Sequence, residues 1–392
     1  MTEKNIEEKN IKEKYIKEKK TRNQGIYLFF IAVIVVGTTL NLWEFLRRSE
    51  PDGRMRGLNQ LVTVEDAAIN AWGGFQRLLG KQAAYGSTFY EDVTLLENGY
   101  ATMADRDPSY AAAVEGAEGA YVLAQEIGAE FLYVQTPAKQ RYEEEFPDGV
   151  INYSMSKHEG AVSSLRQAGV PLIDMREVLE QSGEDWYNYF YQSDHHWRNN
   201  AAFLAYQEIC GYMAECGMPI HQEYLEESQY EKILYEDVFL GTHARMAGTL
   251  YAGLDDYELW LPLFDTAFTL DVASQGIHLE GSFEDCFVHY ENLDHPSFDY
   301  YAYYAYLKED FDCFEIVNQN NPEGAHVLIV RDSSAVPVSV FLAEQCSELD
   351  ILDLRYSGEQ DMISYIREQQ PDLILYIFGP GYLGNEGAMI LR

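Results

Sequence analysis

The sequence predicts an α/β fold with a parallel sheet that is covered by helices on both faces. From about residue 86, short apolar runs alternate with segments whose apolar residues recur at helical spacing. This alternation is typical of a parallel sheet with crossover helices. Ligands of such sheets bind beyond the carboxyl ends of the strands. Ser333 comes just after the apolar run 326–330, so it is a candidate site residue.

The elements are expected in a regular order along the chain. Before the middle of the chain, apolar periodicity predicts helices at about 62–79, 111–127, 159–167, after Asp174, and at 199–210, and strands at 131–135 and 170–173. The last quarter is the clearest part: strand 326–330, turn 331–334, helix 336–345, strand 349–354, helix 362–368 and strand 373–378.

The middle segment, about 221–310, is rich in Tyr, Phe, Asp and Glu and lacks clear periodicity. We expect it to be an insertion or a long lid with a few strands. Its aromatic residues are candidates for stacking on sugars, although packing in a core is the more common use of such rings. The residues concerned are Tyr251, Tyr257, Trp260, Tyr300, Tyr301, Tyr303, Tyr304 and Tyr306.

Three segments precede the predicted domain at 86–392. Residues 1–24 are a charged tail, 25–46 hold a long apolar run and 47–85 form a juxtamembrane linker and helix. At about 1.5 Å per residue the run is long enough to cross a bilayer. Because bulky and charged residues follow it, we expect an uncleaved transmembrane helix; a cleaved signal peptide is the alternative. Eight Lys/Arg precede the run and only Arg47 and Arg48 closely follow it, which predicts a single-pass cell-membrane protein with a cytoplasmic N-terminus and an extracytoplasmic domain.

The charge of the chain limits its partners. Residues 1–24 have a net charge of +3, which leaves 20 basic and 59 acidic side chains, or −39, in residues 25–392. A chain this acidic does not bind nucleic acid by neutralising phosphates. The five cysteines show no CxxC pair and no zinc spacing. A Cys210–Cys216 bridge is one option, so the cysteines do not settle the redox compartment.

Asp194, His196 and Ser333 supply the three groups of a Ser-His-Asp site. A serine hydroxyl is a weak nucleophile until a base takes its proton, and histidine suits that task. A carboxylate then orients the imidazole and stabilises the imidazolium. Residues two apart in an extended segment project the same way, so Asp194 is expected to reach His196, while His195 is structural or lines the pocket.

Other interpretations of these residues stay open. Asp194, His195 and His196 are also possible metal ligands, although no further residue shows ligand spacing. The whole motif is alternatively a cap for the helix at 199–210 with a buried Trp197. Ser333 and Asp332 are also ordinary turn residues, and chemistry alone does not exclude Ser334 as the nucleophile.

Asp194-His195-His196-Trp197 resembles the signature of the DHHW family, which is SGNH-hydrolase-like and related to the alginate O-acetylation proteins. The resemblance covers roughly residues 86–380. Further segments that resemble the family are 131–139, 239–242, 255–259, 330–333, 341–343 and 353–356.

The resemblance implies a three-layer, flavodoxin-like (SGNH-hydrolase-like) fold and a triad in which Asp194 and His196 precede Ser333. Two positions depart from the family: Ser334 replaces the usual aromatic residue, and Val336 stands where Asn is frequent. Substrate-binding residues are expected among the polar and aromatic neighbours of the triad: His195, Trp197, Lys139, Asp332, Arg355 and Tyr356.

The activity implied is O-acetyl transfer to, or removal from, an exported or cell-surface polysaccharide, beside a membrane-bound acyltransferase. No cofactor and no metal are expected. The alternatives are a catalytically silent carbohydrate-binding or assembly protein that keeps the fold, and an acyl-ester hydrolase without a polymer partner.

Overall fold

A computed structural model describes residue 35 and residues 65–85, 92–358 and 361–392. The chain divides into two compact units, residues 1–71 and residues 72–392, and the second holds the central sheet. Among the described residues, no helix has both the length and the apolar character needed to cross a membrane. The predicted anchor at 25–46 lies outside the described residues except for residue 35, so it stays a prediction, as do the proposed segment boundaries.

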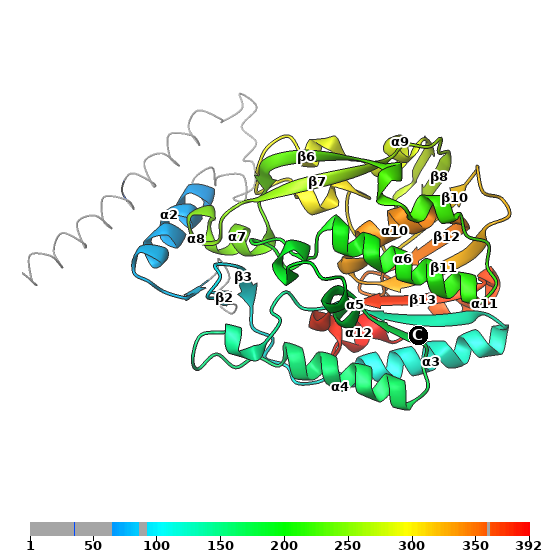
Figure 1. Ribbon diagram of the computed structural model, residues 1–392, viewed down its shortest axis with the longest axis horizontal. Coiled ribbons are helices and arrows are strands. Elements are labelled where there is room, and N and C mark those ends of the chain that lie inside the picture. Colours follow the sequence, from blue (N-terminus) through cyan, green and yellow to red (C-terminus); the bar gives the residue numbers. More distant parts are fainter. Residues whose placement is uncertain (1–34, 36–64, 86–91, 359–360) are drawn as a thin grey trace, which may run out of the picture. The chain divides into compact units, whose positions relative to one another are not determined.

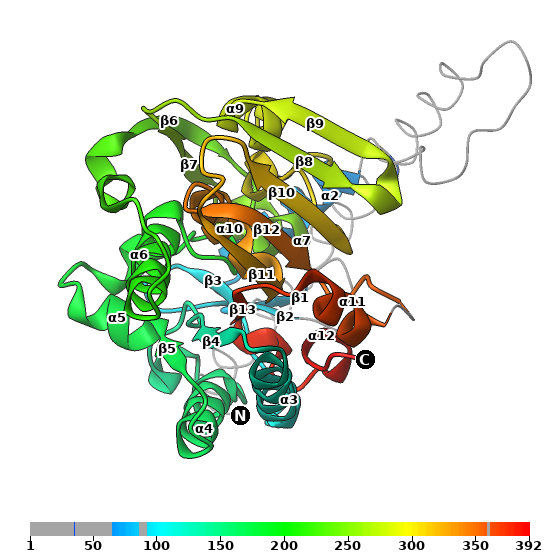
Figure 2. The same ribbon diagram turned by 90° about the vertical axis from the view of Figure 1, so that its right-hand side faces the viewer.

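An eight-stranded sheet forms the centre of the domain (Figures 1 and 2). The strands lie in the order β5 (Leu172–Asp174), β4 (Glu130–Gln135), β13 (Leu373–Phe378), β11 (Ala325–Arg331), β12 (Cys346–Leu352), β10 (Cys313–Asn318), β8 (Phe268–Val272) and β9 (Ile277–Gly281). The first five are mutually parallel, whereas β10, β8 and β9 are antiparallel.

The prediction of a parallel sheet is therefore correct for the five strands from β5 to β12 and wrong for the three strands β10, β8 and β9. Strands β11 and β13 are buried almost throughout, as parallel strands between two helical layers are. In contrast, β8 and β10 alternate between buried and half-buried residues, the pattern of antiparallel strands with one covered face. The sheet is mixed because the middle of the chain adds strands to its edge.

Helices cover both faces of the parallel part (Figure 1). Along β11, Leu328 and Val330 pack into one apolar cluster, with residues of α3, α4, α11 and α12, while Val327 and Ile329 pack into the other, with residues of α5, α6 and α10. The bounds of these helices are Ala111–Ile127 (α3), Ser154–Gln167 (α4), Met175–Gln181 (α5), Asn199–Glu215 (α6), Val336–Ala343 (α10), Met362–Gln369 (α11) and Glu386–Met389 (α12). The predicted bounds of α3 and β13 are reproduced.

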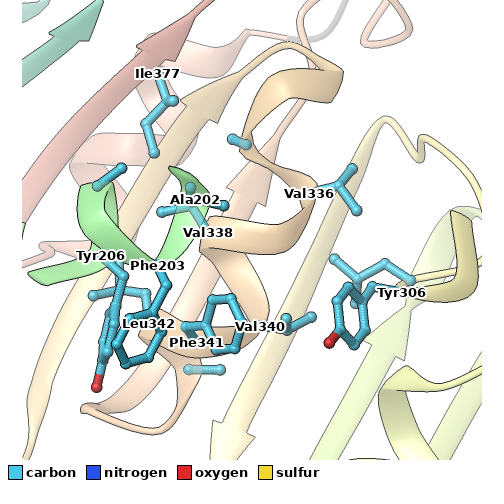
Figure 3. Packing of buried hydrophobic residues seen from close by; sticks show 14 of the residues in the cluster. Ala202, Phe203, Tyr206, Tyr306, Val336, Val338, Val340, Phe341, Leu342 and Ile377 are labelled. Atoms are coloured by element: carbon cyan, nitrogen blue, oxygen red, sulfur yellow. The ribbon is translucent and has the colours of Figure 1, made fainter. Parts of the chain in front are cut away.

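Helix α10 is buried on all sides (Figure 3). Phe341 packs edge-on against Phe203 of α6, with ring centroids 5.3 Å apart. The ring of Tyr306 packs edge-on against Phe341 as well, at 6.3 Å, and Figure 3 shows Val340 beside it. A helix that is apolar all round belongs in a core, and this one begins just beyond Ser333, so the position of Ser333 is fixed by core packing.

The middle segment contributes a two-stranded ribbon as well as the edge strands. Strand β6 (Tyr230–Phe239) pairs antiparallel with β7 (Asp255–Pro262). The other helices and strands are α2 (Glu65–Leu78), β1 (Ala83–Tyr85), β2 (Asp92–Leu95), β3 (Ala101–Met103), α7 (Thr242–Ala247), α8 (Thr249–Ala252) and α9 (Phe283–Phe287). Short 3-10 helices are η2 (Glu143–Glu145), η3 (Trp186–Tyr189), η4 (Gln222–Leu225), η5 (Glu227–Gln229), η6 (Ala273–Gln275), η7 (Tyr290–Asn292), η8 (Ala302–Ala305), η9 (Ser333–Ala335) and η10 (Pro380–Tyr382).

The contact between α3 and α12 gives a stability prediction with an internal control. A Cβ added at Gly116 would lie 2.1 Å from the carbonyl oxygen of Met389, whereas one added at Gly119 meets nothing within 4 Å. We expect Gly116→Ala to lower the free energy of unfolding by about 1–3 kcal/mol through overpacking. Gly119→Ala should raise it by about 0.5–1 kcal/mol, because glycine is a poor helix former. Urea unfolding measures both, and equal stabilities for the two variants would contradict this packing.

Candidate active site

The turn that carries the Asp-His-His motif is tied to the start of β7 by a buried carboxylate. Asp255 accepts hydrogen bonds from the backbone N–H of Gln192 (2.6 Å), and from the N–H (2.7 Å) and hydroxyl (2.6 Å) of Ser193. The adjoining segment approaches so closely that a Cβ at Gly241 would lie 2.4 Å from the carbonyl oxygen of Ser193. The turn therefore has a single position relative to β7 and α7.

Asp194 is fully buried and accepts four hydrogen bonds. Its Oδ1 accepts from the ring Nδ1 of His196 at 2.7 Å and from the backbone N–H of His196 at 2.9 Å. Its Oδ2 accepts from the backbone N–H of Thr242 at 2.6 Å and from the hydroxyl of Tyr301 at 2.5 Å. Burial by itself raises the pKa of Asp194, but the charges of His195 and His196 and the hydrogen bond from His196 hold this pKa well below its usual value.

His196 joins this carboxylate to Ser333. Its Nε2 lies 2.9 Å from Ser333 Oγ, and both side chains are buried. The imidazole lies between two rings, Tyr303 at a centroid distance of 3.6 Å and His195 at 3.8 Å. The three residues expected to form a triad are thus brought together across 137 positions of the chain, in a continuous hydrogen-bonded line.

The backbone at Ser333 is fixed from both sides. The buried carboxylate of Asp332 accepts from the N–H groups of Ser334 (2.8 Å) and Gly379 (2.7 Å), which ties the end of β11 to the end of β13. The hydroxyl of Tyr303 donates to the carbonyl of Ser333 at 2.7 Å, and the indole N–H of Trp197 donates to that of Ser334 at 2.9 Å. Asp332 and Trp197, expected as substrate contacts, are both buried and hold the turn that carries Ser333.

A donor for a developing oxyanion is present beside Ser333. Within the described part of the chain, the backbone N–H of Ser333 has no hydrogen-bond acceptor. It stands at the start of η9, which runs into α10, and the positive end of a helix favours negative charge. Val336 has a hydrocarbon side chain that is buried in the core, so this position offers no side-chain donor.

The remaining predicted residues lie in different surroundings. Lys139 is buried, and its ammonium donates to the carbonyls of Ala101 (2.5 Å) and Gln192 (3.1 Å). Arg355 is held by Asp353 at 2.5 Å and Asp310 at 2.9 Å, with its guanidinium 5.3 Å from the ring centroid of the exposed Tyr356. The side chain of His195 is 51% exposed. Of these residues, Lys139 is the one that supports the Asp-His-His turn, through its hydrogen bond to the carbonyl of Gln192.

Sequence reasoning gave no role in the triad to Tyr301, Tyr303, Thr242 or Asp255. The two tyrosines were noted only as stacking or packing residues, because a run of tyrosines carries no signal of what each hydroxyl meets. Thr242 and Asp255 lie in segments that resemble the family, which was the one available signal. Tyr257 and Trp260 are buried, and both belong to the large core cluster.

The metal interpretation uses the same cluster of side chains. Ligand atoms of Asp194, His195 and His196 lie within 4.8 Å of one another. Both ring nitrogens of His196 are already engaged, however, by Asp194 and by Ser333. An ion there would have to displace one of these contacts, so the geometry favours the hydrogen-bonded triad.

A sheet with parallel strands and a Ser-His-Asp line beyond the end of β11 is similar to the arrangement that the sequence resemblance implies, that of an SGNH hydrolase-like domain. The comparison with known families agrees with this class: residues 95–251, which include Asp194 and His196, match the family described as SGNH hydrolase-like domain, acetyltransferase AlgX. No curated protein sequence matches the chain.

Solved structures share the fold. PatB1 of Bacillus cereus is 19% identical, with a TM-score of 0.63 over 76% of this chain and 98% of that one. PatB1 with a sulfonyl adduct gives 18% identity and a TM-score of 0.59 over 76% and 99%. A DHHW family protein from Eubacterium siraeum gives 17% and 0.57 over 80% and 100%. The resemblance to the DHHW family and to the alginate acetylation proteins is confirmed.

Burial of Lys139 predicts a pH dependence of stability. Burial lowers the pKa of Lys139 to about 7, whereas an unfolded lysine has a pKa near 10.4. Between these values the unfolded chain holds a proton that the folded chain has lost, so stability rises with pH in this window. The free energy of unfolding of the wild type minus that of Lys139→Met should grow by about 1 kcal/mol per pH unit between pH 7.5 and 9. Denaturant unfolding at several pH values measures this, and a constant difference would show that Lys139 keeps its charge.

Proposed function

We propose that this protein is an acyl-transfer enzyme in which Ser333 is the nucleophile, His196 the general base and Asp194 the residue that orients this base and stabilises its protonated form. The observation that carries the proposal is the continuous line from Asp194 through His196 to Ser333, with contacts of 2.7 and 2.9 Å. A base must be within hydrogen-bond reach of the proton it takes, and this one is.

The steps follow from the geometry. Ser333 Oγ attacks the carbonyl carbon of an acetyl ester and passes its proton to His196 Nε2. The N–H of Ser333 stabilises the resulting oxyanion. The C–O bond to the leaving group then breaks, and that oxygen takes the proton from Nε2, which leaves an acetyl-serine. A sugar hydroxyl or water repeats the sequence in reverse, loses its proton to His196 and carries the acetyl group away.

We further propose that the acceptor or substrate is an exported or cell-surface polysaccharide. The matched family is described as an acetyltransferase, and the sequence predicts an anchored, extracytoplasmic domain. The exposed ring of Tyr356, beside the held guanidinium of Arg355, suits a sugar face and its hydroxyls. A membrane-bound acyltransferase is the partner that would supply acetyl groups.

Hydrolysis of p-nitrophenyl acetate by the full-length chain tests the nucleophile and the base. Ser333→Ala should reduce the rate to that of the ester alone, and His196→Ala should lower kcat by about 10²–10⁴-fold. Asp194→Ala should also be severely impaired, because the base loses its orientation. Ser334→Ala is the matched control, since Nε2 of His196 pairs with Ser333, and it should keep most of the activity.

The alternative of a silent binding protein predicts a different pattern. A wild type no faster than Ser333→Ala would remove the enzyme proposal, and loss of activity in Ser334→Ala alone would move the nucleophile to that residue. A sulfonyl fluoride gives an independent readout: intact mass should increase by one sulfonyl group in the wild type and in Ser334→Ala, and stay constant in Ser333→Ala.

Stacking of Tyr303 on His196 should stabilise the imidazolium that forms during transfer. A cation over an aromatic face gains about 0.5–2 kcal/mol, so kcat of Tyr303→Leu should lie about 2- to 30-fold below that of Tyr303→Phe, which keeps the ring and loses only the hydroxyl. Tyr300→Leu, at an exposed position, controls for loss of a tyrosine. Equal kcat values for the Phe and Leu variants would rule out a contribution from stacking.

A further inference from the structure

A row of titratable side chains crosses one face of the central sheet, away from the triad. Figure 2 shows its strands side by side. His278 of β9 pairs with Asp271 of β8, Asp271 with Glu315 of β10, and Glu315 with Asp350 of β12. Beyond Asp350, His326 of β11 is paired with Glu348 of β12. We call these six residues the polar row.

The polar row is more than a solvated acidic surface. Glu315 lies directly opposite a carboxylate on each side, Asp271 and Asp350, and like charges in opposed positions destabilise a sheet. Among the described residues, Glu315 has neither a salt bridge nor a side-chain hydrogen bond, since the histidines pair elsewhere. His278 pairs with Asp271 at 2.7 Å and His326 with Asp350 at 2.8 Å. The polar row thus has four carboxylates, and its two histidines do not neutralise all of their negative charge.

Three ligand atoms converge at one end of the polar row. His326 Nε2 lies 2.8 Å from Asp350 Oδ2 and 3.6 Å from Glu348 Oε1, and all three atoms lie within 4.8 Å of one another. Ligands about 2.0–2.2 Å from a tetrahedral zinc ion are roughly 3.3–3.5 Å apart. An ion would therefore take the place of the hydrogen bond between His326 Nε2 and Asp350 Oδ2, and these two atoms would move slightly apart to admit it.

The surroundings support these ligands in the way a metal site requires. The Asp350 side chain is fully buried and that of His326 is 15% exposed, while Glu348, at 34%, leaves a way in from solvent. The hydroxyl of Tyr365 on α11 donates to Asp350 Oδ1 at 2.8 Å, which turns Oδ2 toward His326. Such outer hydrogen bonds orient metal-ligating carboxylates.

We propose that His326, Glu348 and Asp350 bind a divalent transition-metal ion of the zinc class. One imidazole nitrogen with two carboxylate oxygens is a donor set for such an ion, whereas Mg²⁺ and Ca²⁺ prefer oxygen alone. The ion would join β11 to β12 and neutralise charge beside Glu315. Ser333 follows the opposite end of β11, roughly 20 Å away at 3.3 Å per residue, so the site is structural and independent of the acyl-transfer proposal.

Calorimetric titration of the chelator-treated full-length chain with Zn²⁺ tests the site. Wild type should bind an ion that His326→Gln and Asp350→Asn do not bind. Tyr365→Phe should weaken binding by about 10- to 100-fold. Glu280→Gln is the matched control, because it removes a carboxylate from the same strand face opposite Thr269 and should change nothing. His196→Ala should retain this ion, which separates it from binding at the triad.

Three results would overturn the proposal: no Zn²⁺ bound by the wild type, binding unchanged in both His326→Gln and Asp350→Asn, or loss of binding in His196→Ala alone. Equal affinity for Ca²⁺ and Zn²⁺ that is insensitive to His326→Gln would likewise exclude a histidine ligand. Glu348→Gln is the variant that keeps the test valid if the buried substitutions prevent folding, because Glu348 is partly exposed. Its substitution should still weaken Zn²⁺ binding at least tenfold. Substitution by Co²⁺ gives a visible spectrum that should disappear in the same variants.

Discussion

The buried carboxylate of Asp194 is the constraint on which the site depends. A charge taken out of water is costly unless hydrogen bonds replace its hydration, and four donors do so here. They come from three segments: the motif itself, the start of α7 at Thr242, and Tyr301 just before η8. Each donor has to reach the same two carboxylate oxygens. The hydrogen bonds to Asp194 therefore also set the positions of α7 and η8. The middle of the chain is therefore part of the site as well as an extension of the sheet.

The turn after β11, which carries Ser333, is the second part of the site that is held in one position. Asp332 binds the N–H groups of Ser334 and Gly379, and a Cβ at Gly379 would lie 2.9 Å from Ser334 Oγ, so the ends of β11 and β13 are held close together. Helix α10, buried on every side, prevents the turn from moving. Ser333 and His196 thus meet because the end of the parallel sheet and the segments around Asp194 pack into one core cluster that leaves both side chains little freedom.

Local patterns in the sequence predicted the parallel part of the fold and pointed to the three side chains that the structure joins in one hydrogen-bonded line. Helix α3 and strand β13 have strong periodicity or continuous apolar runs, and the two-residue spacing of Asp194 and His196 decides which histidine faces the carboxylate. The middle of the chain was expected to hold a few strands, but their positions and antiparallel pairing were not predicted. Strands β8 and β9 have only five residues each, and β8 joins the sheet through β10, which is distant in the sequence. Tyr301 meets Asp194 across 107 positions. The burial of Lys139 was not predicted, because lysine is seldom buried.

The two departures from the family acquire a physical interpretation from the neighbours of Ser333. Val336, in place of a polar residue, is packed in the core, which leaves the backbone N–H of Ser333 as the donor at the helix start. Ser334, in place of an aromatic residue, keeps its side chain small where Gly379 comes close. Tyr303 places an aromatic ring against His196, and its hydroxyl donates to the carbonyl of Ser333. One tyrosine from η8 therefore joins the base and the nucleophile's backbone, so a change at the position after the serine does not by itself argue against acyl transfer.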